Sequence, residues 1–516
     1  MTDAAATPAH SGLRPWWETR WFVAAMILLA AVPLLYPPIP PLVDLLGHMG
    51  RYRVELDLAQ SPDLQRYWEF KWALIGNLGV DLLIIPFAKV FGLELGVKLI
   101  VLAIPPLTVA GFLWVAREVH GRIPPTALFA LPFAYGHPFL FGFVNFSLSM
   151  ALAFLAFGLW LRLARLDRLR LRAALFVPIS FVVFITHTFG WGVLGLLCFS
   201  AEAVRQHDRG RSWWSAGLHA AGQAATLGLP LLVLLLWRHD SAGGLTADWF
   251  NFEAKFFWLA TALRDRWQVF DVASVGLAIG ILLVVLLRNS LGFSRNLGFS
   301  TLILIAGFVI LPRVIFGSAY ADMRLVPFIL AVSLLAARFR THTDMATARL
   351  LATVGVAFVI VRVVANTLSL GMAADHQQAQ LMALDHVAPG SRVISFAGQP
   401  CIAGWALARN SHLGAFAIVR RHAFENDQWF VSGANLLKAR DPRPYGEFAS
   451  DPSQIVLPDR CGNKEWRSLN TALAQFPRQS FDYLWLIDPP AHEARLVSGL
   501  SLVWKGEGSI LYKIPR

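Results

Sequence analysis

Eleven runs of apolar residues, each long enough or nearly long enough to cross a bilayer, dominate this chain. A helix that spans the hydrocarbon core needs about 20 predominantly apolar residues. Of the 516 residues, 56% are hydrophobic and 15% are charged, whereas soluble domains carry about a quarter charged residues. The sequence therefore predicts a mainly α-helical membrane protein with about eleven transmembrane helices. The runs cover 21–37, 95–116, 124–140, 144–164, 173–188, 190–204, 214–237, 269–287, 299–316, 324–338 and 349–370.

The net charge of +12 gathers in short loops between these runs. Arginines cluster within 162–172, 205–211, 288–295 and 338–349, where acidic residues are few. Such an excess of basic residues is typical of cytoplasmic loops. The charge pattern therefore reports topology, and no nucleic-acid partner is expected. It places the N-terminal tail (1–20) in the cytoplasm and places 38–94, 238–268, 317–323 and 371–516 outside.

The segment 72–91 (WALIGNLGVDLLIIPFAKVF) is apolar enough to be a twelfth span. A crossing here would move every later basic loop to the outer side, against the charge pattern. Asn77, Asp81 and Lys89 recur on one side of the segment, so an amphipathic helix lying in the outer interface is predicted instead. The transmembrane domain then covers 21–370, and 38–94 is its first outer loop with interfacial helices.

The composition changes after residue 370. The segments 391–397, 454–458, 481–488 and 500–514 have the pattern of strands with Gly and Pro between them, and the last predicts a hairpin. Residues 371–516 are therefore predicted to form a small α/β domain outside the membrane, in the periplasm. Cys401 and Cys461 could pair if this region faces an oxidising compartment, and the sequence leaves that pairing open.

The first outer loop carries an unusual set of polar side chains. In residues 41–53 (PLVDLLGHMGRYR), Asp44, His48 and Arg51 stand at positions i, i+4 and i+7. A helix would place all three on one face. A carboxylate, an imidazole and a guanidinium together at a membrane surface indicate an enzyme more than a pore.

With the topology, these segments resemble the GT-C superfamily of integral-membrane glycosyltransferases, which includes protein O-mannosyltransferases and lipid A aminoarabinose transferases. The likeness covers nearly the whole chain, although Asp44 is followed by Leu45 where many members have a second acid. Its motifs are PLVDLLGHMGRYR, NLGVDLLIIPFAKVFG, GFVNFSLSMALAF (142–154), FITHTFGWG (184–192) and ADMRLVPFILA (321–331).

The resemblance implies transfer of a sugar from a polyprenyl-phosphate carrier to an envelope lipid, glycan or protein on the outer face of the bacterial inner membrane. Asp44 would act as the general base on the acceptor hydroxyl, or would hold a divalent cation such as Mg or Mn, with His48 as a second catalytic residue or metal ligand. The bland alternatives are a helix cap or an ion pair with Arg51 for Asp44, and a backbone hydrogen bond for His48.

Further residues are predicted to contact the substrate or the lipid phosphate. Arginine is suited to this because its guanidinium binds phosphate bidentately. Each arginine has a structural alternative, such as snorkelling to headgroups or pairing with a nearby acid: Arg51 with Asp44 or Glu55, and Arg324 with Asp322. The predicted residues are Arg51, Asp81, His187, Arg313, Asp322, Arg324 and Arg362.

Two other functions compete with the transferase. A transporter or lipid flippase would show paired halves with helices broken at matching positions, and the prolines of this chain show no such pairing. A non-catalytic assembly factor would use residues 371–516 to hold a partner. Replacement of Asp44 distinguishes the three, because only the enzyme should lose its function while remaining folded.

Overall fold

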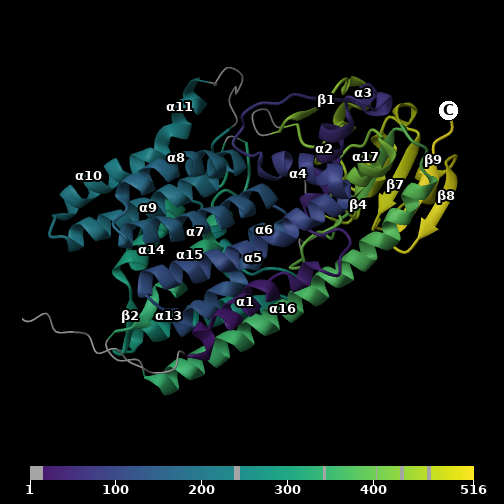
Figure 1. Cartoon of the computed structure of the whole chain (residues 1–516). Coiled ribbons are helices and arrows are strands. Elements are labelled where there is room, and N and C mark those ends of the chain that lie inside the picture. The colour runs from purple at the N-terminus through teal and green to yellow at the C-terminus, as the bar shows by residue number, and fades with distance from the viewer. Residues whose placement is uncertain are drawn as a thin grey trace, which may run out of the picture.

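The structure, a computed structural model, describes residues 15–236, 245–315, 317–340, 344–401, 404–430, 435–461 and 466–516. Helices form most of it, and a small sheet stands at the C-terminal end (Figure 1). The longest helix, α16 (Met345–Leu381), runs along one side of the bundle as far as the sheet. Its continuous 37 residues extend well past the predicted end of the last span at 370.

Five helical segments of the described part of the chain are long and apolar enough to cross a membrane. Three shorter apolar segments, Arg20–Leu34, Arg295–Ile310 and Met323–Ala336, accompany them. A multi-pass membrane protein is therefore supported, whereas the predicted count of eleven crossings stays a prediction. The five are α5 (Leu93–His120), α7 (Val144–Arg165), α8 (Leu169–Thr186), α13 (Gln268–Leu287) and the segment Met345–His386.

The predicted spans at 124–140 and 214–237 do not form single α-helices. The first consists of a buried 3₁₀-helix, η3 (Pro125–Tyr135), and the short helix α6 (His137–Phe141). Pro125, Pro132 and Pro138 lack the backbone N–H that an α-helix needs, which explains the break. The second is divided by the 3₁₀ turn η4 (Ala225–Gly228) between α10 (Trp213–Ala224) and α11 (Leu229–Leu236).

The first apolar segment and the predicted first outer loop form short helices and one short strand. The chain forms α1 (Arg20–Leu29), η2 (Val32–Leu34), α2 (Leu45–Asp57), α3 (Pro62–Tyr67), strand β1 (Trp68–Phe70) and α4 (Gly79–Phe91). On α4, Asp81 is buried while Leu82 and Val90 are exposed. The buried side of α4 also carries Val80 and Ile84, and Lys89 is exposed, so Asp81 and Lys89 do not share one face as predicted.

The remaining elements complete the bundle and the C-terminal region. Between α8 and α13 lie α9 (Thr188–Asp208), α10, α11 and α12 (Phe252–Ala260). A small β2–β3 pair (Leu291–Phe293 with Ala337–Phe339) flanks α14 (Arg295–Ile310), η5 (Met323–Leu325) and α15 (Val326–Ala336). Beyond α16, α17 (Phe416–Arg421) and α18 (Leu469–Gln475) accompany the sheet.

The C-terminal sheet has five strands in the order β6-β4-β7-β9-β8. Strand β4 pairs in parallel with β6 and β7, and β9 pairs antiparallel with β7 and β8. All four predicted strand segments contribute, and the last forms the expected hairpin. The strands are β4 (Val393–Gly398), β6 (Ile455–Val456), β7 (Tyr483–Ile487), β8 (Ser501–Gly506) and β9 (Ser509–Lys513).

The sheet and the first outer loop share one core. Strand β1 pairs antiparallel with β5 (Leu437–Ala439) of the C-terminal region. Val54 of α2 and Trp68 of β1 pack in the same buried cluster as Ile394 of β4. Since segments more than 300 residues apart in the chain form this core, the first outer loop and the C-terminal region hold each other in position.

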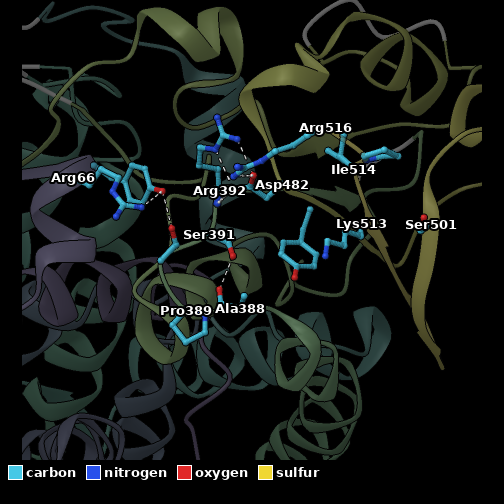
Figure 2. Close-up of a pocket in the computed structure, with 14 residues that line it drawn as sticks. Arg66, Ala388, Pro389, Ser391, Arg392, Asp482, Ser501, Lys513, Ile514 and Arg516 are labelled. Atoms are coloured by element: carbon cyan, nitrogen blue, oxygen red, sulfur yellow. Dashed lines mark hydrogen bonds and ion pairs between the residues drawn. The ribbon is translucent and has the colours of Figure 1, made fainter.

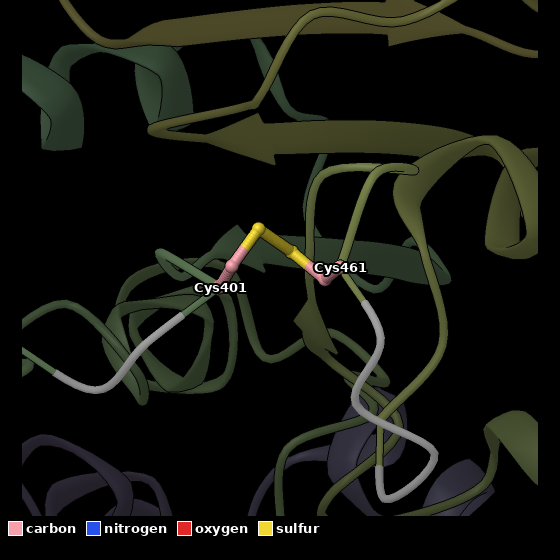
Figure 3. Close-up of a disulfide and its surroundings, with 2 residues drawn as sticks. All are labelled: Cys401 and Cys461. Atoms are coloured by element: carbon pink, nitrogen blue, oxygen red, sulfur yellow. A yellow bond between two sulfur atoms is a disulfide. The ribbon is translucent and has the colours of Figure 1, made fainter.

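A disulfide joins Cys401 to Cys461 (Figure 3). It connects the segment after β4 to the segment after β6, two neighbouring parallel strands of the sheet. The pairing that the sequence left open is therefore present. Cys198 is free and buried in α9.

Candidate functional site

Asp44 is held at the start of α2 by the backbone of a neighbouring turn. Its amide donates to the carbonyl of Phe141 (2.9 Å), and its carbonyl accepts from the amide of His48 (3.1 Å). Gly142, at φ +100°, lies so close that an added Cβ would stand 2.6 Å from the Asp44 nitrogen. Only glycine meets both conditions easily, so the turn at 141–142 fixes the backbone of Asp44.

The carboxylate of Asp44 has no hydrogen bond or ion pair within the described residues. It does not cap α2, and Arg51 is paired elsewhere, so both structural alternatives for this side chain are set aside. The side chain is partly exposed. Burial of the carboxyl and the charge of Asp451 raise its pKa well above the ordinary value, and Arg324 partly offsets this. Asp44 is thus desolvated, accessible and free to act on a ligand.

Arg51 forms a buried ion pair with Asp81 of α4 (2.8 Å). Asn145 of α7 donates to the same carboxylate (3.0 Å) and accepts from the amide of Val80 (2.6 Å). Burial and the charge of Asp81 raise the pKa of the neighbouring Glu55 to about 9. Two residues predicted to contact the substrate, Arg51 and Asp81, are therefore engaged with each other, and they fasten α2 to α4 and α7.

His48 stands one turn after Asp44 and is partly exposed. Its ring lies 5.0 Å from the ring of Trp429 and 6.4 Å from that of Tyr52, centroid to centroid. Burial, with the positive charge of Arg51, holds the pKa of His48 well below the ordinary value. The imidazole is therefore neutral and can accept or donate a hydrogen bond beside Asp44.

Arg324 is the predicted arginine that the structure brings toward Asp44. It contacts the ring nitrogen Nε2 of His187 (3.4 Å) and the hydroxyl of Ser318 (3.2 Å), and it lies over the ring of Phe143 (4.2 Å to the centroid). Within the described residues no carboxylate forms an ion pair with it. The charge of Arg324 also acts on the Asp44 carboxyl, so a buried cation without an ion-pair partner among the described residues lies near the free carboxylate.

The other predicted residues lie in separate pairs. Asp322 pairs with Lys255 (3.3 Å) and accepts from the amide of Met323, so it does not neutralise Arg324. Arg313 pairs with Asp248 (3.5 Å). Arg362 of α16 pairs with Asp271 (2.7 Å) and donates to the Leu263 carbonyl (2.9 Å). Their predicted phosphate contacts therefore remain predictions, since each has a protein partner.

Sequence reasoning missed a group of residues that the C-terminal region brings to α2. All of them lie in the sequence between strands β4 and β6, and they are His412, Asp427, Trp429 and Asp451. The run Glu425–Gln428 reads as an exposed polar loop, whereas all four of its side chains are buried. Four consecutive polar residues between Phe424 and Trp429 are the one local signal that marks it.

A site for a divalent cation beside Asp44 would need further ligands from neighbouring side chains. Among the described residues, no group of three His, Cys, Asp or Glu side chains is arranged to hold a metal ion. Asp44 and His48 therefore do not belong to a three-ligand set in this part of the chain. Their predicted role as metal ligands stays a prediction from the resemblance.

A cavity where α3 meets the C-terminal region lies away from Asp44. It has a volume of about 970 Å³ and opens between α3, the turn at 388–392 and the ends of β7 and β9 (Figure 2). Arg392 and Arg516 both bond to Asp482 in its wall. None of the residues predicted as site residues lines it.

No family model matches this chain, and no curated protein matches it. Two crystal structures of ArnT from Cupriavidus metallidurans are similar to it. The one bound to undecaprenyl phosphate has a TM-score of 0.49 and 11% identity, and covers 96% of this chain and 97% of that chain. The apo state has a TM-score of 0.46 and 12% identity with the same coverage.

Proposed function

We propose that this protein transfers a sugar from a polyprenyl-phosphate carrier to an envelope acceptor on the outer face of the inner membrane. The observation that carries the proposal is the free, desolvated carboxylate of Asp44 facing the unpaired guanidinium of Arg324. Transfer from a lipid phosphate requires a base for the acceptor hydroxyl and a cation for the phosphate, and Asp44 and Arg324 would supply them.

Asp44 takes the proton of the acceptor hydroxyl as the oxygen attacks the anomeric carbon of the sugar. The new glycosidic bond forms while the bond from that carbon to the phosphate oxygen breaks. The raised pKa of Asp44 makes it a stronger base than an exposed aspartate, because a carboxylate that holds its proton more tightly removes one more readily.

Arg324 receives the leaving group. The phosphate gains negative charge as the sugar leaves, and a cation already in place stabilises that charge without reorganisation. Phe143 and His187 hold the guanidinium without neutralising it. The positive charge that is costly to bury alone is thereby available to the lipid phosphate.

The disulfide supports the proposed side of the membrane. Disulfides persist in oxidising compartments such as the periplasm and are rare in the cytosol. Cys401–Cys461 lies in the region whose Gln428 and Trp429 contact Gly47, one turn after Asp44. A site built partly from this region would face the periplasm, as the distribution of basic loops predicts.

The proposal is tested with purified protein in liposomes, supplied with a polyprenyl-phosphate lipid extract and an envelope extract from a strain that lacks the protein. Loss of sugar from the donor lipid and a matching mass gain in the envelope fraction are expected with wild type, and neither with Asp44→Asn. Equal transfer by both proteins would refute the role of Asp44. A lipid that only changes leaflet would indicate a flippase.

A further inference from the structure

Part of the C-terminal region rests directly on the first turn of α2. Gln428 donates from Nε2 to the carbonyl of Gly47 (3.2 Å). An added Cβ at Gly47 would stand 2.6 Å from the Trp429 ring and 3.4 Å from the Cβ of His412. The two segments are therefore in contact one turn from Asp44, with glycine at the point of closest approach.

Buried hydrogen bonds connect this contact to the sheet. The amide of Ser395 on β4 donates to Asn426 (2.8 Å), and the amide of Asp427 donates to Glu425 (2.7 Å). Asp427 also accepts from the amide of Ala415 (2.9 Å). These bonds tie residues 425–427 to β4 and to Ala415, so the sheet fixes where residues 412–429 meet α2.

Asp451 is presented by the same scaffold. One carboxylate oxygen, Oδ1, accepts from Gln454 (2.7 Å) and lies 4.0 Å from Nε2 of His412, and the Asp451 amide donates to the Gln428 carbonyl (3.1 Å). The side chain is 23% exposed. Its second oxygen, Oδ2, has no hydrogen bond to the described residues, so it is available to a ligand.

We propose that Asp451 is the second carboxylate of the site, that it accepts a hydrogen bond from a hydroxyl group of the acceptor, and that His412 positions it. This inference rests on the proposed function. It assigns the acceptor side of the site to the C-terminal region and the donor side to Arg324.

The charges around Asp451 decide which substrate it meets. Asp451 is close enough to Asp44 for its charge to act on that carboxyl, so a phosphate placed beside both would be repelled. Groups that donate hydrogen bonds, such as sugar hydroxyls, suit two neighbouring carboxylates. The acceptor chemistry is therefore that of a hydroxyl-bearing glycan or lipid headgroup.

His412 lies beside Asp451, on its buried side. The ring is 6% exposed, contacts Trp429 (4.4 Å between centroids) and lies 3.9 Å from the Asp427 carboxylate through Nδ1. It stands between two acids, with its position set by the tryptophan. Replacement by leucine removes the polar contacts while keeping an apolar side chain there, and replacement by glutamine keeps a hydrogen-bond donor.

The experiment uses the full-length protein in liposomes, with the same two extracts varied one at a time. Asp451→Asn should raise the amount of envelope extract that gives half-maximal rate about tenfold, the effect of weakening one hydrogen bond to a charged group. The half-maximal amount of donor extract should change less than about twofold. Asp451→Glu and His412→Gln should keep the half-maximal amount of envelope extract near the wild-type value, whereas His412→Leu should raise it. Asp441→Asn is the matched control.

The outcomes separate the inference from the proposed function. Unchanged acceptor half-saturation in Asp451→Asn, or a rise for the donor instead, overturns the inference while transfer by wild type keeps the function. No transfer by wild type overturns both. If its melting temperature shows that Asp451→Asn is unfolded, the two His412 variants decide. A raised acceptor half-saturation in His412→Leu with a normal value in His412→Gln supports the positioning role, and a normal value in His412→Leu contradicts it.

Discussion

Arg51 and Asp81 form a buried ion pair, 2.8 Å between nitrogen and oxygen, that joins two helices of the first outer loop. This ion pair determines whether Asp44, two helical turns before Arg51, has a partner. Because Arg51 is engaged with Asp81, and because Asp44 does not cap α2, the Asp44 carboxylate is left free. The structure thereby separates an acid that holds the fold from an acid available for chemistry.

These two acids should respond oppositely to the same substitution. Asp81→Asn leaves Arg51 as an unpaired buried charge and should lower the free energy of unfolding by about 3–5 kcal/mol. Asp44→Asn removes a desolvated charge that has no partner and should leave the melting temperature unchanged or higher. Thermal unfolding of both variants in detergent measures this. A large destabilisation by Asp44→Asn would contradict a free carboxylate.

Glu55 predicts a pH dependence of stability. Its pKa is raised to about 9 in the folded protein, from 4.5 in the unfolded chain, so the folded protein binds a proton that the unfolded chain has released. This contribution to stability is fully present below about pH 4.5 and is lost as the pH rises toward 9. Glu55→Gln should remove this pH dependence, and it should stabilise the protein by about 1–3 kcal/mol at pH 7, because glutamine folds without taking up a proton. The check is denaturant unfolding at several pH values, where parallel curves for both proteins would refute it.

Arg324 predicts a defect that concerns the donor. Arg324→Gln removes the charge that we propose for the lipid phosphate and should lower the rate about 100-fold, since a single group that stabilises developing charge contributes about this much. Arg324→Lys should recover part of it, because lysine keeps the charge and loses the planar fork. Rates with the donor extract measure this, and Arg443→Gln, on an exposed side chain, is the control. A normal rate in Arg324→Gln would place the phosphate elsewhere.

The disulfide predicts a loss of stability on its removal and the side of the membrane on which the C-terminal region lies. Cys401 and Cys461 enclose a loop of 60 residues, so the Cys401→Ser and Cys461→Ser variants should each lose about 2–4 kcal/mol of stability. Alkylation of intact cells, before and after reduction, reports the compartment on a gel. Labelling that appears only after reduction by an impermeant reagent is expected. Free thiols accessible only after lysis would place the region in the cytosol.

Local periodicity predicted part of the site. His48 and Arg51 share α2 (Leu45–Asp57), as their spacing indicates, and Asp44 directly precedes its first residue. The partner of Arg51 was not predictable from that spacing, since Asp81 is 30 residues away on another helix. The strands of the C-terminal sheet also form in the four segments that the sequence pattern predicted.

Contacts between segments distant in the chain could not be predicted from the sequence. Nothing local joins Asp451 or His412 to α2, because the shared core of the outer loop and the sheet brings them together. The break at 124–140 has a local cause that hydropathy ignores, namely prolines within an apolar run. Apolar length alone therefore overstates the number of single, continuous helices.

The most direct test of the account is mass spectrometry of lipid-linked and envelope glycans from a deletion strain that expresses wild type or Asp44→Asn at equal level. We predict that wild type restores one sugar on the envelope and that Asp44→Asn, although folded, leaves that sugar on its polyprenyl-phosphate carrier. Restoration of the sugar by Asp44→Asn would contradict the central claim.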